Sequence, residues 1–267
     1  MIKGYATTPL GQLHYVEAGN GVPILLLHQT PRSFDEFAEV LPLLATSHRP
    51  IAMDMLGFGS SAPEPGGQTI AGMAAGAVAL LDALGIERAH VLGHHTGGAV
   101  AIEVAAAAPE RVSALVLSSA PWTDLAFRRS HTGGDGVDVA ERAADGSHLA
   151  VLWSKRSPYY PADRPDLLDR FIHDALSPGV DPAEGHRACA RYVMEDRIGL
   201  VRAPTLLIGA DSDPFAFPAI GPLSAGLTGV ERLETAVIEG GMIPLMEDKA
   251  DEVVAIVRPF LALVDAE

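Results

Sequence analysis

Two adjacent histidines, His94 and His95, stand where the sequence changes from a strand-like to a helix-like pattern. The apolar run at 89–93 is typical of a strand buried on both faces. The following 97–108 has the composition of a buried helix. Histidine changes charge near neutral pH, so it often acts as a general base. A histidine at such a junction is therefore a candidate for proton transfer.

Three glycines flank this pair, namely Gly93, Gly97 and Gly98. Small residues at these positions predict a sharp turn at which strand and helix pack closely. The residue on such a turn has a backbone conformation that residues other than glycine seldom adopt, although histidine tolerates it better than most types.

The rest of the chain must position this turn. Short apolar or alternating runs predict strands at 11–18, 23–28, 51–55, 89–93, 112–118, 204–209 and 233–239. Helical spacing predicts helices at 33–44, 69–84, 97–108 and 248–263. This alternation predicts an α/β fold in which helices flank an eight-stranded, mostly parallel sheet.

The segment 122–200 interrupts the alternation, because it contains no run typical of a central strand. It predicts helices near 139–153, 165–175 and 183–197. We expect 1–121 and 201–267 to form the core and 122–200 to form an inserted helical cap.

Composition limits the class of protein. Apolar residues make up 48% of the 267 residues, which is ordinary for a globular chain, and the net charge of −15 disfavours nucleic acid and anionic membranes as partners. The single cysteine, Cys189, cannot form an internal disulfide, and the start of the chain lacks the pattern of a secretion signal. We expect a soluble cytoplasmic protein that binds a small organic molecule, either as a monomer or as a homodimer.

Several motifs, in this order, resemble those of the α/β-hydrolase fold superfamily. They are the turn at 28–31 (His-Gln-Thr-Pro), the turn at 54–61 (Asp-Met-Leu-Gly-Phe-Gly-Ser-Ser), the elbow at 91–98, the loop at 209–214 and the loop at 240–245. The resemblance covers the whole chain and implies the α/β-hydrolase fold. Aligned residue by residue, it places His95 at the nucleophile position, Asp213 at the acid position and Met242 at the position of the catalytic histidine.

This chain therefore departs from the Ser-His-Asp pattern at two of three positions. Methionine cannot accept the proton of a serine nucleophile. The imidazole of His95 can instead approach Asp213, directly or through water, and form a base oriented by a carboxylate. The alternatives are that His95 is a relic in a binding protein, that Asp213 caps its loop and that Met242 only lines the pocket. His94 is interpreted as a packing or hydrogen-bonding residue beneath the elbow.

The resemblance also implies an oxyanion hole made by the backbone N–H groups of Thr30 and Thr96. Gln29 stands where the family usually has glycine, and its amide is a candidate pocket donor. Other pocket candidates are Asp124, where some relatives carry the acid, and the aromatic residues Trp122 and Trp153. A helix cap for Asp124 and core packing for the tryptophans are the alternatives.

The leading hypothesis is an enzyme for a small, largely apolar carbonyl or ester-like compound, working with His95 as base. Hydrolysis, elimination, isomerisation and cyclisation all remain open, and we expect neither a cofactor nor a metal. The main alternative is a non-catalytic ligand-binding protein that keeps the family's pocket. A third hypothesis is a serine nucleophile elsewhere, at Ser60, Ser118 or Ser119.

Overall fold

The computed structural model describes residues 1–64, 66–131 and 138–266. Eight strands form one sheet in the order β1-β2-β4-β3-β5-β6-β7-β8. Their bounds are β1 Ile2–Thr8, β2 Gly11–Glu17, β3 Val22–Leu27, β4 His48–Met53, β5 Ala89–His94, β6 Val112–Ser118, β7 Thr205–Ala210 and β8 Leu233–Ile238. β1 and β2 are antiparallel to their neighbours, and the other six strands are parallel. The predicted fold class is confirmed, although the sequence patterns did not assign residues to β1.

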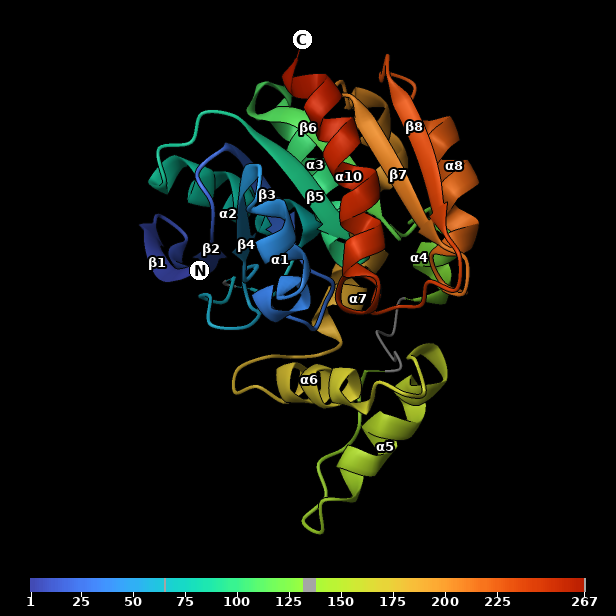
Figure 1. Cartoon of the computed structure of the whole chain (residues 1–267). Coiled ribbons are helices and arrows are strands. Elements are labelled where there is room, and N and C mark those ends of the chain that lie inside the picture. The colour runs from blue at the N-terminus through green and yellow to red at the C-terminus, as the bar shows by residue number, and fades with distance from the viewer. Residues whose placement is uncertain (65, 132–137, 267) are drawn as a thin grey trace.

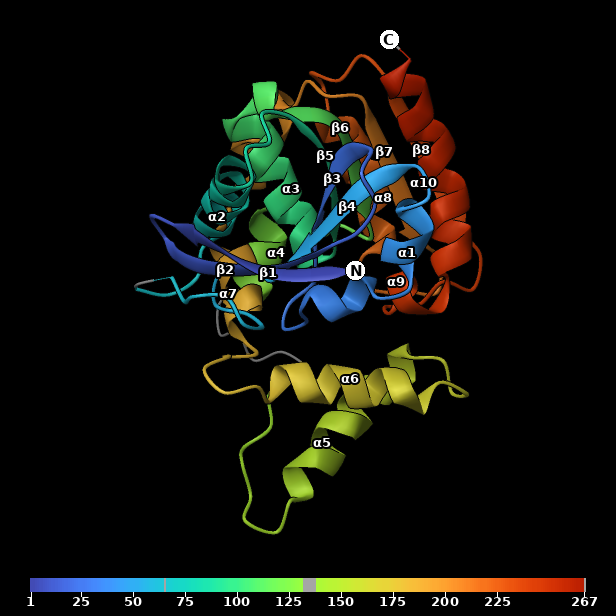
Figure 2. The ribbon, with the colours of Figure 1, turned by 60° about the vertical axis from the view of Figure 1, so that its left-hand side comes forward.

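Helices cover both faces of the sheet (Figures 1 and 2). α2 (Ile70–Ala83) and α3 (Thr96–Ala107) pack on one face, while α1 (Val40–Leu44) and α10 (Ala250–Asp265) pack on the other. Alternate strand residues enter the two cores: Val91 faces the α3 side and Leu92 the α10 side. Because both faces are buried, the parallel strands read as continuous apolar runs.

Between β6 and β7 the described residues form helices and no strand. They are α4 Leu125–Ser130, α5 Ser147–Arg156, α6 Pro165–Ala175 and α7 Glu184–Arg191. Figures 1 and 2 show α5 and α6 as a lobe projecting from the core, whereas α4 and α7 lie against it. The two remaining helices are α8 Ile220–Gly226 and α9 Leu245–Asp248.

Three helix predictions need correction. The helix expected at 139–153 begins only at Ser147, because Gly146 at its N-cap has a left-handed backbone with φ 79°. The helix expected at 183–197 ends at Arg191, where Tyr192 turns to an extended conformation. The helix expected at 33–44 is a 3-10 turn at Phe34–Phe37 followed by α1. In the part of the chain that the structure describes, no helix combines the length and apolarity that crossing a membrane requires.

Candidate active site

The predicted elbow is present between β5 and α3. His95 has φ 47° and ψ −118°, and its backbone N–H donates to the carbonyl of Ser118 at 3.0 Å. A Cβ added at Gly93 would lie 2.1 Å from the Gly97 carbonyl oxygen, and one added at Gly97 would lie 2.0 Å from that of Leu27. The glycines are therefore required by the close approach of strand and helix around the turn.

The elbow brings the imidazole of His95 to the carboxylate of Asp213. Nε2 of His95 lies 2.8 Å from Oδ2 of Asp213, whose side chain is completely buried while that of His95 is 16% exposed. The distance is that of an ion pair. The structure thus brings together the two residues that the sequence singled out as base and acid, and their catalytic roles stay a prediction.

Asp213 is fixed by its own loop as well as by His95. Its Oδ1 accepts hydrogen bonds from the backbone N–H groups of Phe215 at 3.0 Å and Ala216 at 3.2 Å. Burial alone would raise the pKa of Asp213, but His95 and these two donors outweigh it and lower the pKa to about 2. The carboxylate therefore remains ionised opposite the imidazole at neutral pH. Loop capping and pairing with His95 coexist in this one side chain.

His94 lies beneath the elbow, as its interpretation in the sequence expected. Nδ1 is 3.1 Å from Oγ of Ser118, and Nε2 is 3.0 Å from the carbonyl oxygen of Ile243. Complete burial, together with the neighbouring charge of His95, lowers the pKa of His94 to about 3. His94 is therefore a neutral residue that ties β5 to the loop carrying Met242.

The two threonines of the predicted oxyanion hole contact each other. Oγ1 of Thr30 lies 2.9 Å from Oγ1 of Thr96, and both residues are buried. Within the described residues, neither backbone N–H has an acceptor, so both remain available to a ligand oxygen. Gln29 differs: its backbone N–H donates to Glu36 at 2.7 Å, and its buried side-chain amide also interacts with the Glu36 carboxylate.

A buried serine adds a further polar group at this end of the sheet. Ser119 follows β6 as His95 follows β5, and the register pairs the preceding residues His94 and Ser118. Ser119 has φ 45°, close to the φ 47° of His95, and its Oγ lacks a partner in the described chain. By contrast, Ser118 is fully buried and its hydroxyl contacts His94. Sequence reasoning could name both serines but could not separate them.

The remaining predicted pocket residues have local roles. Asp124 caps α4, with Oδ1 accepting from the N–H of Phe127 at 2.8 Å. Trp122 packs against the core cluster next to Gly226 under α8. Trp153 packs on a cap cluster that includes Tyr160 and Phe171. Asp124 thus caps a helix, and Trp122 and Trp153 pack in hydrophobic clusters, which are the alternatives that the sequence left open for them.

Met242 is half-buried, and the residue after it joins the cap to the core. Ile243 belongs to the apolar cluster of the cap that contains Tyr160, Leu167 and Phe171. The hydroxyl of Tyr160 is buried without a partner among the described residues. The loop that carries the catalytic histidine in the family therefore serves here as a contact between core and cap.

Sequence reasoning missed a buried ionic cluster behind the site. Arg32 is completely buried and donates to Glu247 of α9 at 2.9 Å and, by a short contact, to Asp174 of α6. Burial raises the pKa of Glu247, although Arg32 opposes the shift. The cluster links the segment after Thr30, the cap and the helix that follows the Met242 loop. No local pattern signals it, because the partners are 142 and 215 residues from Arg32.

The site combines an imidazole, a buried carboxylate and free backbone N–H groups. Such a set can remove a proton from water or from a carbon acid and can stabilise an oxyanion. Within the described residues, one group of three His and Asp side chains is spaced to hold a metal ion, and it includes none of these residues.

Comparison with known proteins agrees with this architecture. A model of the family described as the alpha/beta hydrolase fold matches residues 22–248. The chain is 37% identical over 246 residues to the dihydrolipoyllysine-residue acetyltransferase component of the acetoin cleaving system of Pseudomonas putida, covering 88% of this chain and 63% of that protein. It is 28% identical to a non-heme haloperoxidase of Rhodococcus erythropolis, covering 94% and 96%. The chain thus spans less than two thirds of the acetyltransferase component.

Solved structures give the same architecture. A meta-cleavage product hydrolase from Pseudomonas fluorescens superposes with a TM-score of 0.80 at 20% identity, covering 99% of this chain and 98% of that one. A thermophilic esterase from Thermogutta terrifontis superposes with a TM-score of 0.78 at 22% identity, covering 99% of both chains. At these identities the likeness concerns the fold alone.

Proposed function

The chain belongs to the α/β-hydrolase fold family, and we propose that it is an enzyme acting on a small, largely apolar carbonyl or ester-like compound with His95 as its base. The observation that carries the proposal is the 2.8 Å distance between Nε2 of His95 and Oδ2 of Asp213. If the family's serine had simply been lost from the elbow, many other residue types could stand at this position. An imidazole held against an ionised carboxylate is a base with an orienting partner.

In the proposed reaction, one particular ring nitrogen of His95 takes the proton. Because Nε2 of His95 faces Asp213, Nδ1 is the nitrogen left to accept a proton. In hydrolysis, Nδ1 takes a proton from water while the water oxygen adds to the substrate carbonyl. The oxyanion that forms would accept hydrogen bonds from the backbone N–H groups of Thr30 and Thr96. Its collapse expels the leaving group, which takes the proton from Nδ1 and so regenerates the neutral imidazole. Asp213 stays ionised throughout and stabilises the imidazolium.

The same base also fits elimination or isomerisation, because proton removal from a carbon next to a carbonyl needs the same oxyanion donors. The relatives support an enzyme of this family, since those compared include a haloperoxidase and an acetyltransferase component. Apolar cap residues next to Met242 favour a largely apolar substrate. No cofactor is required by this chemistry.

The first test is the aryl ester 4-nitrophenyl butyrate, offered to the wild type, to His95→Ala and to the control His131→Ala in the cap. We expect the wild type and the control to turn it over and His95→Ala to lose turnover by about 10²–10⁴-fold. Binding of the ester's product acid should stay within about tenfold, since His95 would act on the reaction rather than on affinity. Normal turnover by His95→Ala would contradict the assignment of the base.

A fluorophosphonate probe separates this mechanism from a hidden serine nucleophile. The proposal expects no covalent labelling of the active protein. Labelling at Ser119 would replace the His95 water mechanism by a serine mechanism. The double variant His95→Ser with Met242→His is the complementary experiment, because it restores the family's usual residues; labelling of this variant alone would support the alignment of both positions.

A non-catalytic binding protein is the second candidate. It is favoured by Met242, which cannot transfer protons. A ligand recovered unchanged after tight binding, with no turnover of esters or lactones by the wild type, would decide for this candidate.

A further inference from the structure

A second cluster of chemically active side chains lies at the opposite end of β5 from the elbow. His48 is the first residue of β4, His90 the second residue of β5 and Asp265 the last residue of α10. β3 separates the two strands, and its residues Val22 and Ile24 register with His48 and His90. Both histidines are buried, at 4% and 1% exposure.

The carboxylate of Asp265 bridges the two imidazoles. Oδ2 lies 3.3 Å from Nε2 of His48, and Oδ1 lies 3.0 Å from Nε2 of His90. All three ligand atoms lie within 4.8 Å of one another. Two ligands on one tetrahedral zinc ion, each at roughly 2.0–2.1 Å, are separated by about 3.3 Å. Each of the two contacts is close to this length, one through each oxygen of Asp265.

From this geometry we infer that His48, His90 and Asp265 form a binding site for a late first-row divalent cation of the Zn²⁺ class. Two imidazoles and one carboxylate are a ligand set that such ions prefer over Mg²⁺ or Ca²⁺. The three side chains leave the fourth position of a tetrahedral ion to water. Each imidazole coordinates through Nε2 and carries its proton on Nδ1.

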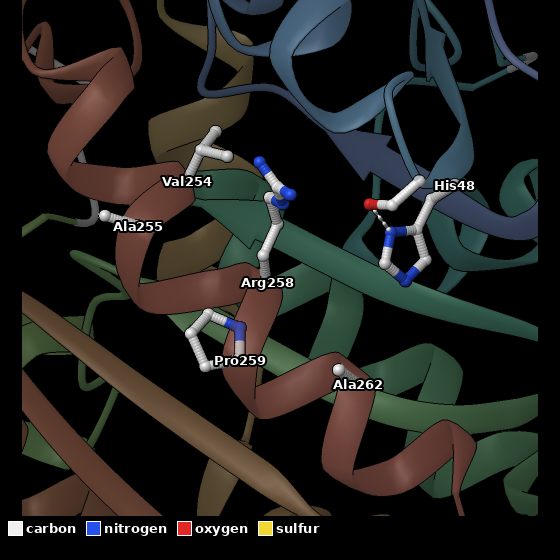
Figure 3. Close-up of a pocket in the computed structure, with 7 residues that line it drawn as sticks. His48, Val254, Ala255, Arg258, Pro259 and Ala262 are labelled. Atoms are coloured by element: carbon white, nitrogen blue, oxygen red, sulfur yellow. Dashed lines mark hydrogen bonds between the residues drawn. The ribbon is translucent and has the colours of Figure 1, made fainter.

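The surroundings of the ligands fit this assignment. Nδ1 of His48 lies 2.8 Å from Oγ of Ser47, a contact drawn as a dashed line in Figure 3. Such an outer partner holds a ligating ring in place. Nδ1 of His90 has no partner in the described chain, so its ring is the less firmly oriented of the two.

His48, one of the three proposed ligands, lines a groove at the surface, whereas His90 and Asp265 are not among the groove's lining residues. Figure 3 shows His48 across a groove from α10, and the groove is lined by Val254, Arg258, Pro259 and Ala262. The side chain of Asp265 is 29% exposed. A cation is attracted by the partial negative charge at the C-terminal end of α10 and by the net charge of −15. The positive charges of Arg258 and Arg88 repel it. Three direct ligands outweigh these two more distant charges.

Titration of the EDTA-treated full-length protein with Zn²⁺, read by competition with a chromophoric chelator, tests the site. We expect one equivalent to bind and the melting temperature to rise with it. Co²⁺ substituted for Zn²⁺ should show visible absorption of the intensity typical of tetrahedral sites. Neither readout depends on the activity of the elbow, so this inference and the proposed function can fail separately.

Variants locate the site. Asp265→Asn replaces the carboxylate by a neutral amide of the same shape at a partly exposed position. His48→Gln removes one imidazole. Each variant should bind Zn²⁺ at least tenfold more weakly than the wild type. His173→Ala, which removes an 82% exposed histidine of the cap, is the matched control and should bind like the wild type. Circular dichroism of each variant checks that it folds. Unchanged binding in both Asp265→Asn and His48→Gln, or no stoichiometric binding by the wild type, would overturn the inference.

Discussion

His95 and Asp213 meet at 2.8 Å although the strands before them, β5 and β7, are separated by β6. The elbow projects the imidazole across the end of β6, where the acid loop turns back toward the sheet. In the family's usual arrangement, which this sequence resembles at 209–214, the acid pairs with a histidine from the last loop. Here that loop carries Met242, and the carboxylate is paired with the elbow residue.

Replacement of Asp213 by asparagine should change which ring nitrogen of His95 carries the proton, and it should also lower the rate of turnover. The carboxylate favours a proton on Nε2 of His95, whereas an amide can offer that nitrogen either its oxygen or its NH₂ group. We expect turnover to fall by about 10²–10⁴-fold. Nitrogen NMR of the labelled His95 ring should show the proton on Nε2 in the wild type and shared between the two nitrogens in the variant. An unchanged ring spectrum would contradict the pairing.

Protonation of Asp213 should also lower stability in strong acid. Its folded pKa of about 2 lies below the ordinary 3.8, so its contribution is fully present above about pH 4 and is lost as the pH falls toward 2. The difference corresponds to about 2 kcal/mol. Asp213→Asn should lack this loss, and urea unfolding at a series of acidic pH values measures it. An identical pH dependence in wild type and variant would refute the shift.

His94 should make the protein less stable in a milder range of acid. Its pKa in the folded protein, about 3, lies below the ordinary 6.5. Between these pH values the unfolded chain binds a proton at His94 and the folded chain does not. Stability is therefore complete above about pH 6.5 and declines as the pH falls from there toward 3. In His94→Gln this decline should be weaker between about pH 7 and pH 5. His173→Gln, at an exposed position, should follow the wild type.

The ionic cluster behind the site should dominate the attachment of the cap. Arg32→Met removes the partner of two buried carboxylates, Asp174 and Glu247, and should lower the free energy of unfolding by about 3–5 kcal/mol. The matched control is Arg164→Met, which removes surface pairs with Asp166 and Asp248 and should cost at most about 1 kcal/mol. Urea unfolding of both variants at neutral pH gives the comparison. Equal costs would show that the carboxylates find other partners.

The elbow and the acid loop were predictable because their signals are local. Gly93 and Gly97 precede and follow the turn that needs them, and Asp213 follows its strand directly.

Asp124 was ambiguous. Its position after β6 suggested an acid, but a residue three positions before a free helix N–H is equally suited to cap the helix. In the structure Asp124 accepts a hydrogen bond from that nearby N–H. The Arg32 cluster could not be predicted, because ion pairs between residues far apart in the sequence produce no regular spacing in it. The cap helix at 165–175 was predicted with its observed bounds, since its apolar side packs along a single cluster.

The contact between Thr30 and Thr96 offers the sharpest test of how the oxyanion loop is held. Each hydroxyl is buried, and the 2.9 Å contact joins the loop after β3 to the first turn of α3. Thr96→Val leaves the buried Thr30 hydroxyl without its partner and should cost about 1–3 kcal/mol, whereas after Thr30→Val the Thr96 hydroxyl keeps its interaction with the Cys189 thiol and the cost should be smaller. The double variant replaces both hydroxyls by methyl groups of similar shape and should cost clearly less than the sum of the two single changes.

Urea unfolding of the four proteins at neutral pH measures the coupling directly, and Thr96→Ser serves as the control that keeps the hydroxyl. If the two single costs simply add, the hydroxyls do not depend on each other and the loop is held by other contacts, such as the Gln29 N–H on Glu36. If they couple, the backbone N–H groups of Thr30 and Thr96 owe their common orientation to this pair. Turnover of the double variant should then fall although its stability recovers, because valine side chains restore packing but not the alignment of the two donors.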